Sequence, residues 1–200
     1  MKKFPFAIPG IKPADIGVLR NMSTFKQYCA TVKTLLANEC PFCLINPEIN
    51  VPLYENDSWM VWHSAFPQRH QSLHLVIPNK RHICQLHELT LADMAHLHDM
   101  FQWIHGKFGE QLPGGGLGAR FGDVNYNIAS VPGHFHWNIQ VPNGEGTVAL
   151  WLAKSPEEIA HADHRATIFE HLRLNGGNLD QLRPNDRDFI VSRDPALVVK

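Results

Sequence analysis

The stretch that decides the fold is Gly133-His134-Phe135-His136-Trp137-Asn138-Ile139-Gln140-Val141-Pro142. With a period of two, its residues separate into a polar set and an apolar set: His134, His136, Asn138 and Gln140 against Phe135, Trp137, Ile139 and Val141. Successive side chains of a β-strand point to opposite faces, so this alternation predicts a half-buried strand with an apolar back. The front of that strand carries four hydrogen-bonding side chains, two of which are imidazoles.

Two interpretations of the His134-x-His136 pair are open. Alternate residues on one strand face lie about 6.5 Å apart, so both imidazoles could act on one phosphate, or one could act while the other is held elsewhere. The structural alternative is an exposed strand face in a chain that has 13 histidines among 200 residues. Pro132 and Gly133 place a turn directly before the first histidine, where free backbone N–H groups can hold an anion, and this favours a functional site.

The bulk composition limits the class of partner. A chain of 200 residues with 44% hydrophobic residues can form one large domain, or a domain with extensions, around a real core. The formal net charge of −1 gives no electrostatic reason to expect nucleic acid or an anionic membrane as main partner. A small phosphorylated ligand needs only local positive potential, and it stays open.

Targeting and redox signals point to the cytoplasm. Pro5, Pro9 and Pro13 interrupt the N-terminal segment, so we do not expect a signal peptide, and no apolar run is long enough to span a bilayer. The chain has four cysteines, of which only Cys40 and Cys43 are close in sequence. This spacing favours a reducing compartment and a metal pair over a disulfide framework.

The pattern of elements predicts an α+β fold, with helices covering one face of a mainly antiparallel sheet. The clearest helix is capped by Thr90 with Asp93 three residues on, and it presents an apolar stripe of Met94, Leu97, Phe101, Ile104 and Phe108. Helices are also expected at 23–39 and 155–174, and strands at 58–63, 73–78, 119–128, 134–142 and 189–191. The glycine-rich segment 113–116 is interpreted as a flexible connection.

Cys40-x-x-Cys43 has two chemical interpretations. One is a redox pair, although a helix normally starts at the first cysteine of such a pair and here Pro47 follows closely. The other is half of a tetrahedral zinc site, which needs two more nitrogen or sulfur ligands. Histidines at strand ends could supply them.

Together these motifs resemble the histidine triad (HIT) superfamily. The resemblance rests on Cys40-x-x-Cys43, on His74-Leu-Val-Ile-Pro-Asn-Lys-Arg-His82, on the long helix and on the His-x-His strand, in this order. It covers roughly residues 40–142 and implies a HIT-like sheet of about five strands with helices packed on it. Residues 1–39 would then be an N-terminal extension with a helix, and residues 143–200 a C-terminal helix and tail packed on the core.

The resemblance also implies roles for single residues. The middle histidine of the motif, here His136, is the family's nucleophile. Asn138 replaces the third histidine, which is similar to the galactose-1-phosphate uridylyltransferase branch, where glutamine stands there. The zinc-bearing members imply a structural zinc ion on Cys40, Cys43, His82 and His134. Contacts to nucleotide or phosphate are implied for Asn127 and Ser130, and the residues themselves suggest Gly133 and Gln140 for phosphoryl oxygens.

One part of the family pattern has no clear match. The acidic residue that often grips the ribose follows the first strand, and Trp62-His63-Ser64-Ala65 stands there instead. Nucleotide specificity therefore cannot be carried over from the family.

Three functions follow as hypotheses. The first is a cytoplasmic nucleotide-processing hydrolase or nucleotidyltransferase that acts at phosphorus through a phosphohistidine on His136. The second is a nucleotide-binding homologue that is catalytically inactive because Asn138 replaces a histidine. The third is a zinc-stabilised domain without phosphate chemistry. The expected partner is a nucleotide or nucleoside phosphate, and a homodimer is possible.

Overall fold

The computed structural model describes residues 40–67, 70–122, 133–150 and 152. Within them lie five strands and one α-helix: β1 (Tyr54–Glu55), β2 (Met60–His63), β3 (Gln71–Pro78), α3 (Leu91–Phe108), β4 (Gly116–Ala119) and β5 (His136–Pro142). Two short 3-10 turns, η2 (Leu86–Glu88) and η3 (Gly109–Gln111), flank the helix. The helices expected at 23–39 and 155–174 and the strand at 189–191 lie outside the described residues.

The five strands form one sheet in the order β1-β2-β3-β5-β4, and every neighbouring pair is antiparallel. The longest pairing joins β3 to β5, from Gln71 opposite Pro142 to Pro78 opposite His136. The His-x-His strand is therefore an interior strand, with β3 on one side and the edge strand β4 on the other. This confirms the predicted α+β class with its mainly antiparallel sheet.

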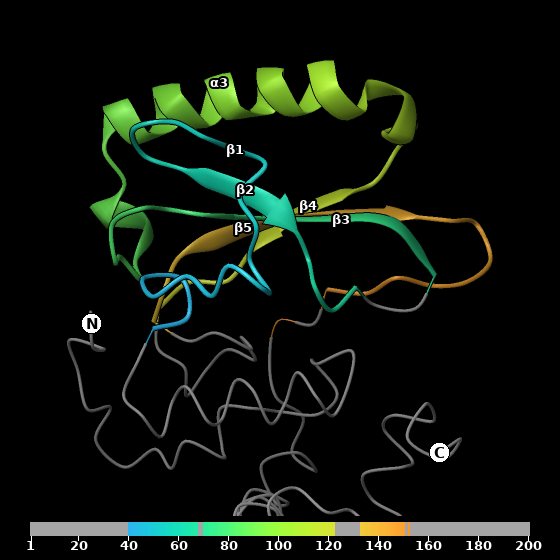
Figure 1. The fold of residues 1–200 in the computed structure, drawn as a ribbon, viewed down its shortest axis with the longest axis horizontal. Helices are drawn as coiled ribbons and strands as arrows, with labels where there is room; N and C mark the ends of the chain where they lie inside the picture. The colour runs from blue at the N-terminus through green and yellow to red at the C-terminus, as the bar shows by residue number, and fades with distance from the viewer. Residues whose placement is uncertain (1–39, 68–69, 123–132, 151, 153–200) are drawn as a thin grey trace, which may run out of the picture.

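Helix α3 covers one face of the sheet (Figure 1). Its buried side chains pack with those of the strands in a single core: Trp59, Val61, Leu73, Leu75, Ile77, Phe135 and Val141 with Leu97, Met100, Ile104 and Phe108. The apolar back predicted for β5 is confirmed, because Phe135 and Val141 are buried there and Trp137 and Ile139 pack against them. The chain from Cys40 lies on the side of the sheet away from α3 (Figure 1).

The start of α3 agrees with the sequence prediction, but its apolar stripe differs by one position. Thr90 accepts a hydrogen bond from the Asp93 N–H, and the Asp93 carboxylate accepts from the Thr90 N–H. Met94 was predicted to be in the stripe, yet it is 46% exposed, whereas Met100 is fully buried. The inward position of the first turn is taken by the buried Asp93, which leaves its neighbour Met94 facing solvent.

Among the described residues, the third predicted strand overlaps an observed strand only at Ala119, and the glycine-rich segment is not only a connection. Strand β4 runs from Gly116 to Ala119; the predicted strand does not continue through 120–122, and its remainder, 123–128, lies outside the described residues. A Cβ atom on Gly115 would lie 2.6 Å from the carbonyl oxygen of Gln140. Glycine therefore allows the chain to approach β5 closely, and the segment begins the strand that pairs with it.

Strand β5 begins at His136, two residues later than predicted. The predicted turn is present, because Gly133 has a φ of 69°, in the left-handed region that favours glycine. His134 thus lies in the turn before the strand, and His136 is the first residue of β5. Of the helices in the described part of the chain, none combines the length and apolarity that crossing a membrane requires.

Candidate functional site

The face of β5 opposite α3 carries a row of buried polar side chains. His134, His136, Asn138 and Gln140 are 3%, 5%, 8% and 9% exposed. On the neighbouring strand β3, His74 lies opposite Gln140 and Val76 opposite Asn138, so His74 belongs to the same face. We call these five polar residues the front row. Because buried polar groups must find hydrogen-bond partners, the contacts of the front row define the state of each side chain.

His136 is held in a single tautomer. Its Nδ1 lies 2.8 Å from the carbonyl oxygen of His134, and since a carbonyl can only accept, Nδ1 carries the proton. The neutral ring therefore keeps its lone pair on Nε2. Burial lowers the pKa of His136 to about 4 and outweighs the hydrogen bond to the His134 carbonyl, which favours the charged form. His136 is thus neutral and keeps an unprotonated Nε2 with a lone pair available for nucleophilic attack.

His74 holds the side chain of Asn138. Its Nε2 lies 3.1 Å from Asn138 Oδ1, and the hydrogen of Nε2 is donated to that oxygen. Burial lowers the pKa of His74, although this hydrogen bond acts the other way, so the ring is neutral. Because Oδ1 is engaged, the amide NH₂ of Asn138 is the group left to donate to a further acceptor. Nδ1 of His74 is buried and has no hydrogen-bond partner among the described residues.

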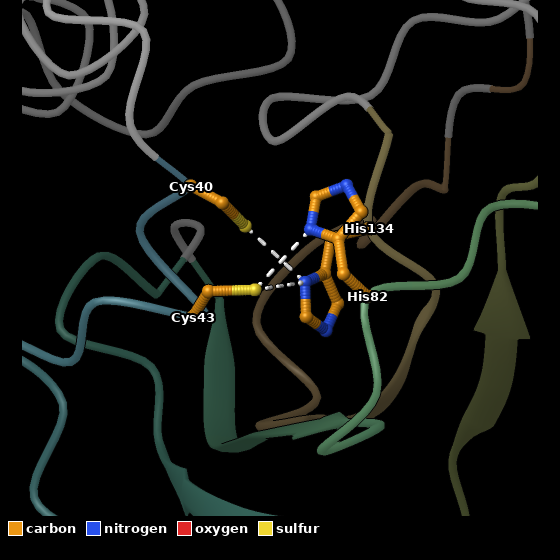
Figure 2. Close-up of side chains that lie close together, drawn as sticks. All are labelled: Cys40, Cys43, His82 and His134. Atoms are coloured by element: carbon orange, nitrogen blue, oxygen red, sulfur yellow. Dashed lines mark hydrogen bonds between the residues drawn. The ribbon is translucent and has the colours of Figure 1, made fainter. Parts of the chain in front are cut away.

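Four side chains of types that bind metals meet at the N-terminal end of β5, and one of them, His134, also belongs to the front row. The sulfur and ring nitrogen atoms of Cys40, Cys43, His82 and His134 all lie within 4.8 Å of one another. Figure 2 shows the two thiols pointing at the two imidazoles. Nδ1 of His134 is 3.2 Å from Cys40 Sγ and 3.5 Å from Cys43 Sγ, and Nδ1 of His82 is 3.2 Å from Cys43 Sγ.

The donor set fits a tetrahedral zinc ion. With Zn–N and Zn–S bonds of about 2.1 and 2.3 Å, tetrahedral ligand atoms lie about 3.6 Å apart, close to the separations seen here. Nε2 of His134 donates to the Asn79 carbonyl at 2.7 Å, which turns the Nδ1 lone pair toward the two sulfurs. The two thiols differ in acidity. A hydrogen bond from Cys40 lowers the pKa of Cys43, and the same bond together with burial raises the pKa of Cys40.

The Cys-x-x-Cys loop also touches the nucleophile candidate directly. Phe42 lies between the two cysteines, and its ring meets His136 edge-on with centroids 4.9 Å apart. The same ring meets His134 at 5.4 Å and Trp62 at 5.6 Å. Phe42, Trp62, Cys40, Met60 and Val76 form a second, smaller buried cluster on this face of the sheet. The four-residue ligand cluster and His136 are thus parts of one packed unit.

Of the remaining predicted site residues, two lie in the described part of the chain and two do not. Gly133 forms the turn before β5, and Gln140 is buried opposite His74, two residues beyond Asn138. Asn127 and Ser130 lie outside the described residues, so their roles stay predictions, as do the roles assigned to the others.

Three residues near the site were not assigned by the sequence: His74, Phe42 and Arg120. Only His74 gave a signal, since it is a histidine on a central, otherwise apolar strand. The other two are recognised only through cross-strand register and packing.

Comparisons with known proteins give matches among solved structures only, because no family model and no curated protein matches the chain. A histidine triad protein from Clostridium difficile is 22% identical, over 56% of this chain and 95% of that one, with a TM-score of 0.41. A Zn-bound histidine triad family protein from Mycobacterium smegmatis is 18% identical, over 68% and 96%, with a TM-score of 0.38. A histidine triad nucleotide-binding protein from Candida albicans is 18% identical, over 68% and 98%, with a TM-score of 0.40. All three are histidine triad proteins, the family whose motifs this sequence resembles.

Proposed function

We propose that this chain is a nucleotide-processing enzyme of the histidine triad type, in which His136 attacks the phosphorus atom of a nucleotide or nucleoside phosphate. The observation that carries the proposal is the tautomer of His136. The carbonyl of His134 accepts from Nδ1, so the lone pair of the ring is on Nε2, on the polar front of the sheet and not in the core under α3. A nitrogen in this state can form a bond to phosphorus without first losing a proton.

The reaction consists of two displacements at phosphorus. In the first, the lone pair of His136 Nε2 forms an N–P bond, and the bond from phosphorus to the leaving group breaks with its electron pair. In the second, the oxygen of water or of another acceptor hydroxyl attacks phosphorus, the N–P bond breaks, and its electron pair returns to Nε2. The acceptor releases its proton to solvent, where the leaving group is also protonated. Water as acceptor makes the enzyme a hydrolase, and another acceptor makes it a nucleotidyltransferase.

The neighbours of His136 supply orientation and hydrogen bonds. The NH₂ group of Asn138, whose oxygen is held by His74, donates to a phosphoryl oxygen. Gln140 and the backbone N–H groups at the Gly133 turn are proposed for the same task, and Asn127 and Ser130 for further contacts to the nucleotide. Such donors are most useful when they point at the charge that develops in the transition state.

Zinc has a structural role in this proposal. Cys40, Cys43, His82 and His134 would hold it, and four protein ligands leave no open coordination position for substrate or water. When bound, the ion joins the Cys-x-x-Cys loop to the turn before β5 and so supports the position of Phe42 against His136. A cytoplasmic location, a homodimer and the division into 1–39, 40–142 and 143–200 are parts of the same proposal.

A turnover assay tests the function. The substrates are a nucleoside phosphoramidate and a dinucleoside polyphosphate, and the variants are His136→Asn and, as matched control, His98→Asn on the exposed side of α3. We expect His136→Asn to lose at least about 10³-fold in kcat, since nucleophile removal commonly costs this much or more, and His98→Asn to stay near wild type. Intact-mass spectrometry of quenched wild type should show a covalent adduct that His136→Asn lacks.

The other outcomes distinguish the alternatives. Equal turnover by wild type and His136→Asn would remove His136 as nucleophile. Nucleotide binding without turnover would favour the inactive homologue, for which the asparagine at position 138 is the motivating observation. Neither binding nor turnover would favour a zinc-stabilised domain without phosphate chemistry.

A further inference from the structure

The described residues contain four lysines and arginines, and they differ in where they lie relative to the front row. Lys80 pairs with Glu55 at 3.0 Å, and Arg81 pairs with the buried Asp93. Lys107 is exposed on α3, on the other side of the sheet from the front row. Arg120 is half-buried and directly follows β4, the strand that pairs with the His-x-His strand. It is the candidate for a permanent positive charge at the site among the described residues.

Strand register brings the end of β4, which Arg120 directly follows, next to the His136 end of β5. In the β4–β5 pair, Gly118 lies opposite Asn138 and Ala119 opposite Trp137. Strand β4 ends at Ala119, so Arg120 is the first residue beyond this ladder, and His136 is the residue of β5 next to Trp137 on the same side. Arg120 therefore follows the end of β4 that lies next to the His136 end of β5, on the side of β5 away from β3.

The electrostatics agree with this placement. The positive charge of Arg120 is one of the groups that disfavour a second positive charge on His136, so it acts on that ring. Burial lowers the pKa of Arg120 to about 10, and the side chain therefore stays charged at neutral pH in a partly desolvated position. A guanidinium in such surroundings interacts with an anion more strongly than one in bulk water.

We propose that Arg120 binds the phosphate group of the substrate at His136 and supplies the local positive charge that the chain as a whole lacks. This inference rests on the proposed function, because it takes a phosphorylated ligand as given. The front row contains only imidazole and amide side chains, which carry no permanent charge, whereas a nucleoside phosphate brings at least one negative charge. The planar fork of N–H donors on arginine matches two phosphoryl oxygens, which a lysine cannot do as well.

Binding measurements test Arg120 separately from turnover. The probes are the four nucleoside 5′-monophosphates and the four matching nucleosides, titrated by calorimetry into wild type, Arg120→Gln, Arg120→Lys and the control Lys107→Gln. We expect Arg120→Gln to weaken binding of the tightest monophosphate by about 10-fold or more, as the loss of a charge-assisted contact does, and to leave nucleoside binding within about 2-fold. Arg120→Lys should fall between, and Lys107→Gln should match wild type.

Each contrary result has a distinct meaning. If wild type and Arg120→Gln bind monophosphates equally, Arg120 is not the phosphate ligand, while the proposed function still stands on the turnover assay. Loss of nucleoside affinity together with phosphate affinity would make Arg120 a structural residue and would also overturn the inference. If Arg120→Gln does not fold, Arg120→Lys provides the test. If this variant prefers monophosphates over nucleosides as strongly as wild type does, and if its binding of monophosphates depends on salt in the same way, the proposed two-pronged contact of Arg120 with phosphate is wrong. A wild type that binds no monophosphate overturns the inference and the proposed function together.

Discussion

At the scale of single residues, the candidate site has few side chains that can transfer a proton, and this limits the reactions that it can catalyse. Asn138 stands where the resembled family has a histidine, and an amide neither donates nor accepts a proton in catalysis. His74, its partner, is a neutral ring that already donates its one proton to Asn138. A leaving group that is stable as an anion, such as a phosphate, departs without help. An amine needs a proton, so we predict that under the proposed function the site favours phosphoanhydrides over phosphoramidates.

Replacing Asn138 by histidine tests this proton inventory. We expect Asn138→His to raise the ratio of kcat/KM for a phosphoramidate to that for a dinucleoside polyphosphate by about 10-fold or more, because general acid catalysis typically contributes 10²- to 10⁴-fold. The measurement is the two kcat/KM values in parallel. Gln140→His, which adds a histidine two positions further along the same face, is the control. A ratio that does not change in Asn138→His would show that the leaving group is protonated elsewhere.

His74 is predicted to act through Asn138 alone. We expect His74→Phe, which keeps a ring but removes the hydrogen bond, to lower kcat about 3- to 10-fold with a smaller change in KM, since a misplaced donor weakens transition-state contacts. His74→Gln, which can donate to Asn138 Oδ1 again, should recover part of the loss. In an Asn138→Ala background His74→Phe should have no further effect on kcat. A full additional loss in that background would contradict the coupling.

At the scale of elements, the strands and helix that carry their own sequence pattern could be predicted, whereas β1 and β4, which carry none, could not. The alternation of β5, the apolar run of β3 and the Thr90 cap of α3 are local signals, and each element is present where they stand. Strand β4 has the sequence Gly-Leu-Gly-Ala, with no alternation to find. It is a strand because Gly115 and its neighbours can lie close against the backbone of β5, which is a tertiary fact.

The same limit applies to the candidate site. The four front-row residues from His134 to Gln140 could be derived from the period of the His-x-His stretch, and the four-residue ligand cluster from motif resemblance. Arg120 and Phe42 could not, because their relation to His136 depends on which strands are neighbours and on how a loop folds over them.

The N-terminus of α3 gives a prediction about stability and pH. Burial alone would raise the pKa of the Asp93 carboxyl, but the Thr90 N–H and hydroxyl, Ser58 and Arg81 outweigh it and hold the pKa well below its usual range. We expect Asp93→Asn to lower the free energy of unfolding at pH 7 by about 1–3 kcal/mol, measured by urea titration. Asp99→Asn on the exposed side of the helix should change it by less than about 0.5 kcal/mol.

The difference in the free energy of unfolding between wild type and Asp93→Asn should change with pH in one direction. A carboxyl whose pKa is depressed in the folded state stabilises the protein fully above its unfolded pKa of about 4. That stability is lost as the pH falls from there toward the folded pKa, where wild-type Asp93 becomes protonated. The gap between wild type and Asp93→Asn should therefore be constant from pH 7 to 5 and narrow below pH 4. A gap that widens on acidification would contradict the assignment of Asp93 as the stabilising carboxylate.

At the scale of the whole molecule, the four-residue ligand cluster joins three segments that are far apart in the chain. Cys40 and Cys43 meet His82 and His134, which are 39 to 94 residues away along the sequence in the contacts formed. An ion that binds all four ligands binds only the folded chain, so its binding free energy adds to the stability of the fold. Because Phe42 lies between Cys40 and Cys43 and contacts His136, an ion bound at this cluster would also hold Phe42 against the candidate active site.

Removal of the metal ligands is therefore expected to affect stability as well as metal content. Wild type and the control Cys84→Ser, whose free cysteine is outside the cluster, should each hold about one zinc ion per chain, as four ligands from one chain imply. Cys43→Ser should hold far less and should unfold at least about 5 °C lower, which for a chain of this size corresponds to a loss of about 2 kcal/mol. Plasma emission spectrometry and thermal unfolding measure the two quantities. Because the effect comes from the ion, a chelator should lower the unfolding temperature of wild type toward that of Cys43→Ser and leave Cys43→Ser unchanged. A wild type that is free of metal, and whose unfolding temperature does not respond to added zinc, would show that the cluster is a set of hydrogen-bonded thiols and imidazoles and would end the zinc proposal.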